Sequence, residues 1–198
     1  MPSHTYFKLA EASFFLKKAN DNWRNVPDFD FYLSAFFSAA RSVTWIMRGE
    51  YENAPEWKAW YDAKQPDNQI VELLKKTNAI RVRSQKSAPI TTRTTATLHT
   101  HGVSAEALKI LSEAKDVRLM PVDSRNEEFY FVVEGRRVAV GRLENAVHEL
   151  PEFPGEHALA ACDRYVRFLD ELVRECEKRF PRNLKQQAEN PVTRPATE

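Results

Sequence analysis

The spacing of apolar and polar residues predicts that most of the chain is helical. The most regular stretch is 156–180, where apolar residues recur every three or four positions. An α-helix has 3.6 residues per turn, so this spacing gathers them on one face. The face consists of Leu159, Cys162, Tyr165, Val166, Leu169, Leu172, Val173, Cys176 and Phe180. We therefore predict a long amphipathic helix at 156–180.

Earlier in the chain the pattern predicts four more helices, at 4–20, 28–48, 54–65 and 68–83. Pro27 suits the first turn of the second helix, because a proline there loses no helical hydrogen bond. Asp67 can cap the fourth helix by accepting from its free backbone N–H groups. Gly49 is expected to end the second helix, since glycine favours the left-handed conformation found after many helices.

After Lys86 the pattern becomes that of strands. The Thr-rich stretch 89–101 favours extended structure. Ser104 is expected to cap a short helix that ends at Ala114. Further strands are predicted at 117–122, 129–133 and 137–143, with Glu134-Gly135 as the turn of a hairpin.

Together these elements predict a mainly α fold. We expect a single domain, 1–180, built as a four- or five-helix up-and-down bundle with a small insertion at 88–145 that contains the β-hairpin. The tail 181–198 holds three prolines, two consecutive glutamines and few apolar residues, so we expect it to be disordered.

Composition agrees with a globular protein, at 42% hydrophobic and 29% charged residues. No apolar run approaches the roughly 20 residues that cross a bilayer. The first residues lack the basic-then-apolar order of a signal peptide. We therefore expect a cytoplasmic protein that makes no membrane contact.

Charge is distributed unevenly along the chain. Residues 73–105 contain no Asp or Glu and six basic residues, which are Lys75, Lys76, Arg81, Arg83, Lys86 and Arg93. Such a segment attracts polyanions, and these six are our candidate residues for binding RNA or another anion. Part of this charge also has a structural explanation, because cations at a helix C-terminus favour the helix dipole by about 0.3–1 kcal/mol each.

The second helix combines small residues with a single internal cation. Ser34, Ser38 and Ser42 recur every fourth position, with alanines beside them, so another helix can approach closely. Arg41 is the one charged residue between Phe31 and Met47. It is either a surface side chain whose stem lies along the protein or a buried charge that needs a partner.

Two segments resemble the HEPN superfamily of helical bundles. Residues 31–43 read FYLSAFFSAARSV, and residues 77–90 read TNAIRVRSQKSAPI at the end of a basic helix. The resemblance covers 1–86 and 156–180 and leaves 88–145 as an insertion. It implies a homodimer with paired motifs in a cleft. It also implies a metal-independent endoribonuclease in which Arg holds the phosphate and His moves a proton.

The motif departs from the family pattern at two positions. Arg81 occupies the Arg position, but Val82 replaces a polar residue and Lys86 stands where His is expected. A lysine, with an ordinary pKa near 10.4, is a poor base at neutral pH. Arg81 and Lys86 are thus weak catalytic candidates, and we expect a dimeric, non-catalytic protein that binds a polyanion. The alternatives are a protein-interaction module acting through 88–145 and a weak metal-independent ribonuclease.

The remaining histidines and aromatic residues suggest no further site. His99 and His101 could share a strand face, but two imidazoles do not make a zinc site, so we predict neither metal nor cofactor. His148 and His157 fall in a polar loop before the last helix. Trp57, Trp60 and Tyr61 are either core residues or a platform for stacking bases.

The two cysteines, Cys162 and Cys176, are predicted on one helix, 14 residues apart. At about 1.5 Å of rise per residue this separates them by roughly 21 Å. A disulfide needs Cα atoms within about 7 Å, so they cannot pair with each other. We expect two reduced, buried thiols.

Overall fold

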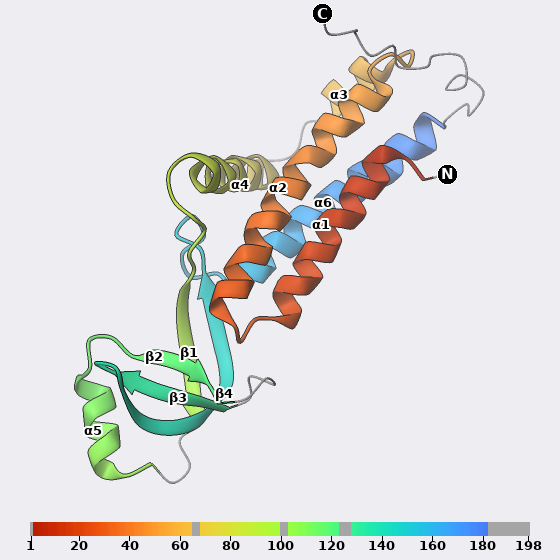
Figure 1. The fold of residues 1–198 in the computed structure, drawn as a ribbon. Coiled ribbons are helices and arrows are strands. Elements are labelled where there is room, and N and C mark those ends of the chain that lie inside the picture. The colour runs from red at the N-terminus through yellow and green to blue at the C-terminus, as the bar shows by residue number, and fades with distance from the viewer. Residues whose placement is uncertain (1, 65–67, 100–102, 123–127, 182–198) are drawn as a thin grey trace, which may run out of the picture.

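A computed structural model describes residues 2–64, 68–99, 103–122 and 128–181. Three long helices lie side by side, and a small sheet projects from one end of them (Figure 1). These helices are α1 (His4–Asp21), α2 (Val26–Tyr51) and α6 (Ala158–Arg179). The other helices are α3 (Trp57–Ala63), α4 (Asn68–Lys86) and α5 (Ala105–Glu113). The expected mainly α fold with a small β insertion is confirmed.

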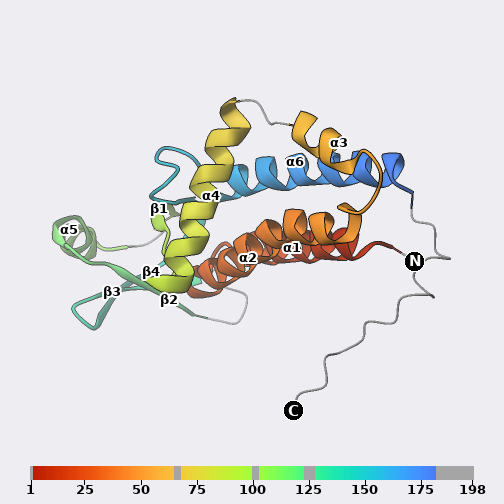
Figure 2. The same cartoon turned by 90° about the horizontal axis from the view of Figure 1, so that it is seen from above.

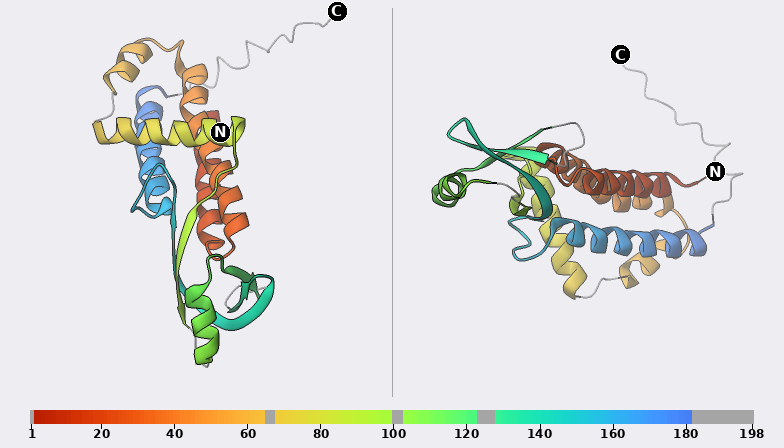
Figure 3. Two further views of the ribbon diagram at one scale, coloured as in Figure 1. Left: turned by 90° about the vertical axis from the view of Figure 1, so that its left-hand side faces the viewer. Right: turned by 90° about the horizontal axis from the view of Figure 1, so that it is seen from below.

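The helix α4 does not run alongside the other long helices. It crosses α2 and α6 in both further views (Figures 2 and 3). Its buried residues Leu73, Thr77 and Ile80 form the side that faces them. The up-and-down arrangement therefore applies to α1, α2 and α6, while α4 lies across them as a cover.

The helix ends show both confirmed and mistaken predictions. Ser104 caps α5 by accepting from the backbone N–H of Ala107 at 3.1 Å, as expected. The helix α2 continues through Gly49 to Tyr51, so the predicted end at Gly49 is wrong. A glycine ends a helix by turning left-handed, and Gly49 keeps helical backbone angles here. Asp67, the predicted cap of α4, lies outside the described residues.

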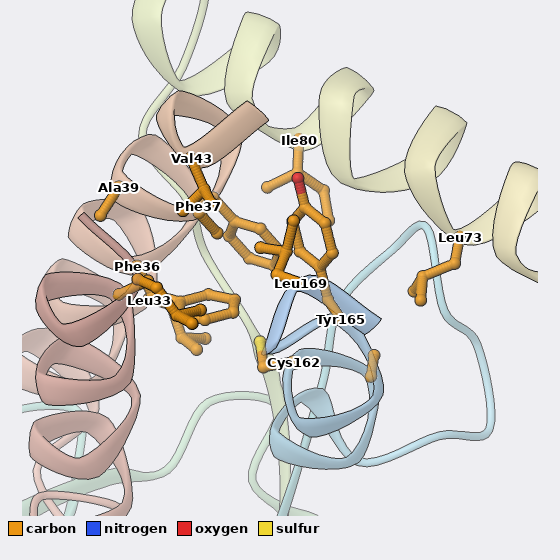
Figure 4. Close-up of a cluster of buried hydrophobic side chains, with 14 of the residues drawn as sticks. Leu33, Phe36, Phe37, Ala39, Val43, Leu73, Ile80, Cys162, Tyr165 and Leu169 are labelled. Carbon is orange, nitrogen blue, oxygen red and sulfur yellow. The ribbon is translucent and has the colours of Figure 1, made fainter. Parts of the chain in front are cut away.

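The core forms where the predicted apolar face of α6 meets α2 and α4 (Figure 4). Cys162 and Leu169 of α6 are fully buried, and Tyr165 reaches from α6 toward Ile80 of α4. The largest side chains opposite them come from α2 and include Phe29, Phe36 and Phe37. Burying such side chains contributes about 1.5–3 kcal/mol each, which makes this face the main source of stability.

Both cysteines are free and buried on α6, as predicted. Burial raises the pKa of the Cys162 thiol well above its ordinary value. Burial also raises the pKa of Cys176 to about 12. Both side chains are therefore neutral thiols at physiological pH, and they pack as small apolar groups.

The insertion forms a four-stranded antiparallel sheet in the order β1-β4-β3-β2. Its strands are β1 (Arg93–His99), β2 (Arg118–Pro121), β3 (Glu128–Val133) and β4 (Arg136–Glu149). The predicted hairpin is confirmed, with φ of 50° at Glu134 and 79° at Gly135. Two positive φ angles match the two-residue turn that suits twisted strands.

The last strand is longer than the sequence predicts. The strand β4 pairs with β3 through its first half and with β1 through its second half, and it ends at Glu149 rather than 143. It therefore reaches from the far end of the sheet back to the helices. Phe129 and Phe131 of β3 are buried but do not belong to the helical core.

A buried histidine joins the sheet to the helices. His148 of β4 is 0% exposed, and its ring lies 4.3 Å from that of Phe29. Its Nε2 lies 2.7 Å from the carbonyl oxygen of Trp23, and its Nδ1 lies 2.8 Å from Oγ1 of Thr94. A carbonyl only accepts, so Nε2 carries the hydrogen and Nδ1 accepts from the Thr94 hydroxyl.

A second polar contact lies at the same junction. Asp30 of α2 accepts hydrogen bonds from the backbone N–H and the hydroxyl of Thr92, at 3.3 Å and 2.8 Å. Burial raises the pKa of Asp30, and the two hydrogen bonds from Thr92 oppose that rise. The contacts of Asp30 and His148 together fix where the chain leaves the bundle and where it returns.

We predict that protonation of His148 destabilises the fold. Burial lowers the pKa of His148, so the unfolded chain binds this proton more readily than the native one. Neutral His148 contributes fully to the free energy of unfolding above pH 6.5. This contribution is lost as the pH falls below that value toward the lowered pKa of the folded state. Urea unfolding at pH 7.5 and 5.5 should show a larger loss of stability in the wild type than in His148→Gln.

The His148→Gln variant should also be less stable at pH 7.5, by about 1–3 kcal/mol, because buried partners lose their hydrogen bonds. The matched control is His4→Gln, which changes an exposed histidine. It should leave both the stability and its pH dependence unchanged. An equal pH dependence in all three proteins would contradict the assignment to His148.

Candidate anion-binding site

The crossing of α4 distributes its cations over two sides of the helix. On one side, Arg83 forms a two-point contact with Glu152, with Nε to Oε1 and Nη2 to Oε2 both at 3.1 Å. The pair is mostly buried, with side chains 29% and 18% exposed. It joins the end of α4 to the segment between β4 and α6. Arg83 is thus placed as a structural cation, whereas the sequence suggested an anion-binding one.

Lys76 lies on the same side as Arg83. Its Nζ is 5.3 Å from the centre of the Phe153 ring, within the range of a cation–π contact. Phe153 itself is buried against the core. Lys76 and Arg83 therefore both hold α4 against the segment that leads into α6.

Besides Lys76, four cations of the acid-free segment have no carboxylate within 4 Å among the described residues. They are Lys75, Arg81, Lys86 and Arg93. The Nη1 of Arg81 donates to Gln85 at 3.2 Å, while its Nε is buried without a hydrogen-bond partner. Lys75, Lys86 and Arg93 are exposed. Their positive charge is therefore available to a ligand.

A cavity of about 430 Å³ lies beside α4, bounded by α2, α3 and α6. Its polar lining consists of Arg41, Thr44, Tyr61, Lys64, Lys75, Asn78 and Tyr165. Its apolar lining consists of Val71, Leu74, Phe168 and Leu172. Three of these residues are cations and none is acidic, so the cavity favours a negatively charged ligand.

The cations around the cavity are not equally free. Lys64 forms an ion pair with Glu175. Arg41 donates from Nη1 to the Thr44 hydroxyl at 3.0 Å, and its guanidinium lies 5.5 Å from the Trp45 ring. Arg41 is half-buried and contacts no carboxylate among the residues described, so it fits neither simple alternative posed from the sequence. Its partners are a hydroxyl and an aromatic face.

Two phenols complete the polar lining. Burial raises the pKa of Tyr165 to about 12, against the opposing effect of the Arg41 charge. Burial also raises the pKa of Tyr61, and Arg41 and Arg48 oppose that rise. Both side chains therefore remain protonated at neutral pH. Tyr61 can donate a hydrogen bond to an anion, whereas the Tyr165 hydroxyl is hydrogen-bonded to Thr77.

The three aromatic residues of α3 belong to the core. Trp57 is buried and stacks on Tyr61, with ring centroids 4.7 Å apart and 12° between the planes. Trp60 meets Phe180 edge-on at 5.5 Å. Trp57 belongs to the buried core, and Trp60 and Tyr61 pack against it partly buried, so the core interpretation holds. Only Tyr61 also reaches the cavity.

The histidines outside this region are not brought together as metal ligands. His101 and the side chain of His99 lie outside what the structure describes. His148 and His157 have ring centroids 5.7 Å apart at the sheet junction, where the His157 Nδ1 caps α6. Within the described ranges, no three His, Cys, Asp or Glu side chains gather where they could hold a metal ion.

Among the helices described, none combines the length and the apolar character needed to span a membrane.

No protein-family model, no curated protein and no solved structure matches this chain. The resemblance to HEPN proteins consequently stays a prediction based on residues 31–43 and 77–90.

The sequence pointed to Lys75, Arg81, Lys86 and Arg93, which the structure leaves unpaired, but it missed the cavity. The isolated charge of Arg41 between Phe31 and Met47 is the one signal of the cavity in the sequence. Its partners in the cavity come from α3, α4 and α6, and no spacing along the chain relates them to it.

We predict that Arg83 contributes to stability through Glu152. The Arg83→Gln change leaves a mostly buried carboxylate without its cation and should lower the free energy of unfolding by about 1–2 kcal/mol. The control is Lys86→Gln, on the same helix end but exposed and unpaired, which should change stability little. Urea unfolding of the three proteins measures the difference, and equal losses in both variants would refute the role assigned to this pair.

Proposed function

We propose that this protein binds a polyanion of the RNA class along α4 and does not cleave it. The observation that supports this most directly is the unpaired state of Lys75, Arg81 and Lys86 within an acid-free segment. Elsewhere most of the basic side chains of α1, α3 and α6 have carboxylate partners, often four residues away. Cations left unpaired on one helix are suited to phosphate contacts.

The positions of these cations suit an extended strand. Lys75 and Lys86 are separated by about three helical turns, so they lie on the same side of α4 roughly 16 Å apart. Arg93 follows at the start of β1, beyond the end of α4. Lysines spaced in this way contact several phosphates in succession, and they select by charge rather than by base sequence.

The same geometry supports binding without cleavage. The proposed HEPN-like motif has Lys86 in place of the histidine that would move the proton. Lys86 is exposed, and no carboxylate contacts it in the described part of the chain. His148 and His157, which precede α6 in the sequence, do not replace the missing histidine. Both already have structural partners at the sheet junction. The homodimer implied by the HEPN resemblance belongs to this proposal, and a solution mass measurement checks it.

We predict that single-stranded RNA binds and that its affinity falls steeply as salt increases. Replacing Lys75, Arg81 and Lys86 together by Gln should make the slope of log K against log salt shallower by about 2, since each phosphate contact on a single strand contributes about 0.7. Fluorescence anisotropy with a labelled oligonucleotide at several salt concentrations measures this slope.

The matched control changes Lys58, Arg167 and Arg174 to Gln. These three are exposed and ion-paired, and their removal alters the net charge by the same amount. The control should bind RNA like the wild type. If it loses affinity as much as the α4 variant, the binding reflects net charge and the α4 site is wrong. RNA cleavage that disappears in Arg81→Ala would instead support a ribonuclease.

A further inference from the structure

The cavity beside α4 has a chemical character that phosphate binding along the helix does not require. One part of its wall is apolar, formed by Val71 and Leu74 of α4 and by Phe168 and Leu172 of α6. Another part carries Arg41 and Lys75. A sugar-phosphate strand on the outside of α4 would leave the apolar wall uncovered. The cavity therefore suits a ligand with both an anionic end and an apolar body.

We infer that this cavity binds a small organic anion, a carboxylate carried on an apolar body, between α2, α3, α4 and α6. This site is distinct in chemistry from the polyanion surface proposed above, although both include Lys75. The volume of about 430 Å³ lies within the range of small-molecule sites, which are mostly apolar with a few polar groups that fix orientation.

Arg41 is the expected partner of the carboxylate. Its planar guanidinium can bind both oxygens of a carboxylate at once, and such paired contacts are stronger than neutral hydrogen bonds. The structure gives Arg41 one hydroxyl partner, Thr44, and no carboxylate among the described residues. A half-buried guanidinium has lost part of its hydration, and without an anion it does not regain all of the lost interactions. A bound carboxylate provides them.

Other groups of the lining also favour a negatively charged ligand. The hydroxyl of Tyr61 can donate to the ligand, and Lys75 adds a second cation without a carboxylate partner at the rim. The charge of Lys64 is already matched by Glu175. Among the described residues that line the cavity none is acidic, so none of them repels a negative group.

The apolar wall favours a hydrocarbon body over inorganic anions. Val71, Leu74 and Phe168 are only half-buried in the protein alone, so a ligand that covers them removes apolar surface from water. Inorganic phosphate can pair with the cations but leaves the apolar wall exposed to water. A carboxylate with a chain of medium length satisfies both parts of the wall.

The test compares three probes with the full chain by isothermal titration calorimetry. Decanoate carries both features, decan-1-ol lacks the charge, and inorganic phosphate lacks the apolar body. Decanoate, kept below the concentration at which it forms micelles, should bind at one saturable site. Decan-1-ol should bind about tenfold more weakly or worse, because the charge-assisted hydrogen bonds to Arg41 are lost. Phosphate should bind more weakly than decanoate as well.

Two variants locate the site. Arg41→Gln should weaken decanoate binding by about tenfold, and Val71→Phe should block it by filling the cavity. The control Arg48→Gln lies on the same helix, in an exposed ion pair with Glu52, and should bind decanoate like the wild type. Thermal unfolding verifies that each variant is folded, and a variant that fails this check is replaced by Tyr61→Phe, for which weaker binding is expected.

The inference is overturned if decanoate and decan-1-ol bind equally well. It is also overturned if binding in folded Arg41→Gln or Val71→Phe matches the wild type, or if decanoate binds without saturation. The result is separate from the RNA experiment, because Val71 carries no charge. The Val71→Phe variant should lose decanoate and keep RNA, whereas the triple Gln variant of α4 should lose RNA in any case.

Discussion

The apolar face of α6 lies between α1, α2 and α4, and the rest of the fold depends on its burial. It presents fully buried residues such as Cys162 and Leu169, and the phenylalanines of α2 pack opposite them. This helix follows the insertion in the sequence. The chain therefore runs through the whole insertion before it reaches the helix that completes the core. It must return to the bundle at a defined place. The buried contacts of His148 and Asp30 fix that place.

The same face of α6 also determines where a ligand can bind. Tyr165 points toward α4, while Phe168 and Leu172 line the cavity beside it. Because α4 crosses the bundle instead of running along it, it covers α6 over part of its length and leaves a hollow next to the crossing. Arg41 faces this hollow from α2. The crossing of α4 over α2 and α6 therefore produces both the packing of the core and the cavity proposed as a binding site.

Periodicity predicted much of the fold, because the apolar face of a helix is visible in sequence. The ranges of α1 and α6, the cap at Ser104 and the turn at Glu134-Gly135 follow from local spacing and turn chemistry. The crossing of α4 does not, since an apolar face shows that a helix is covered but not which helix covers it or in what direction. The strand β4 runs on to Glu149 because β1 pairs with its second half, and that partner is some 50 residues away.

The candidate site was predictable only where its residues are close in sequence. The acid-free segment indicated Lys75, Arg81 and Lys86 directly. It also included Arg83, whose partner Glu152 is 69 positions away and therefore invisible to local charge counting. Arg41 meets the other lining residues only through packing, so the cavity had no signature in the sequence beyond one cation in an apolar helix.

The two cysteines of α6 have a consequence for measuring motion in this protein. Both thiols are buried and protonated, so a reagent in solution reaches them only when α6 separates from its neighbours. Cys162 lies near the start of α6 and Cys176 near its end. The chain thus contains natural probes at both ends of its central helix, and their separate alkylation rates distinguish fraying at one end from opening of the entire core.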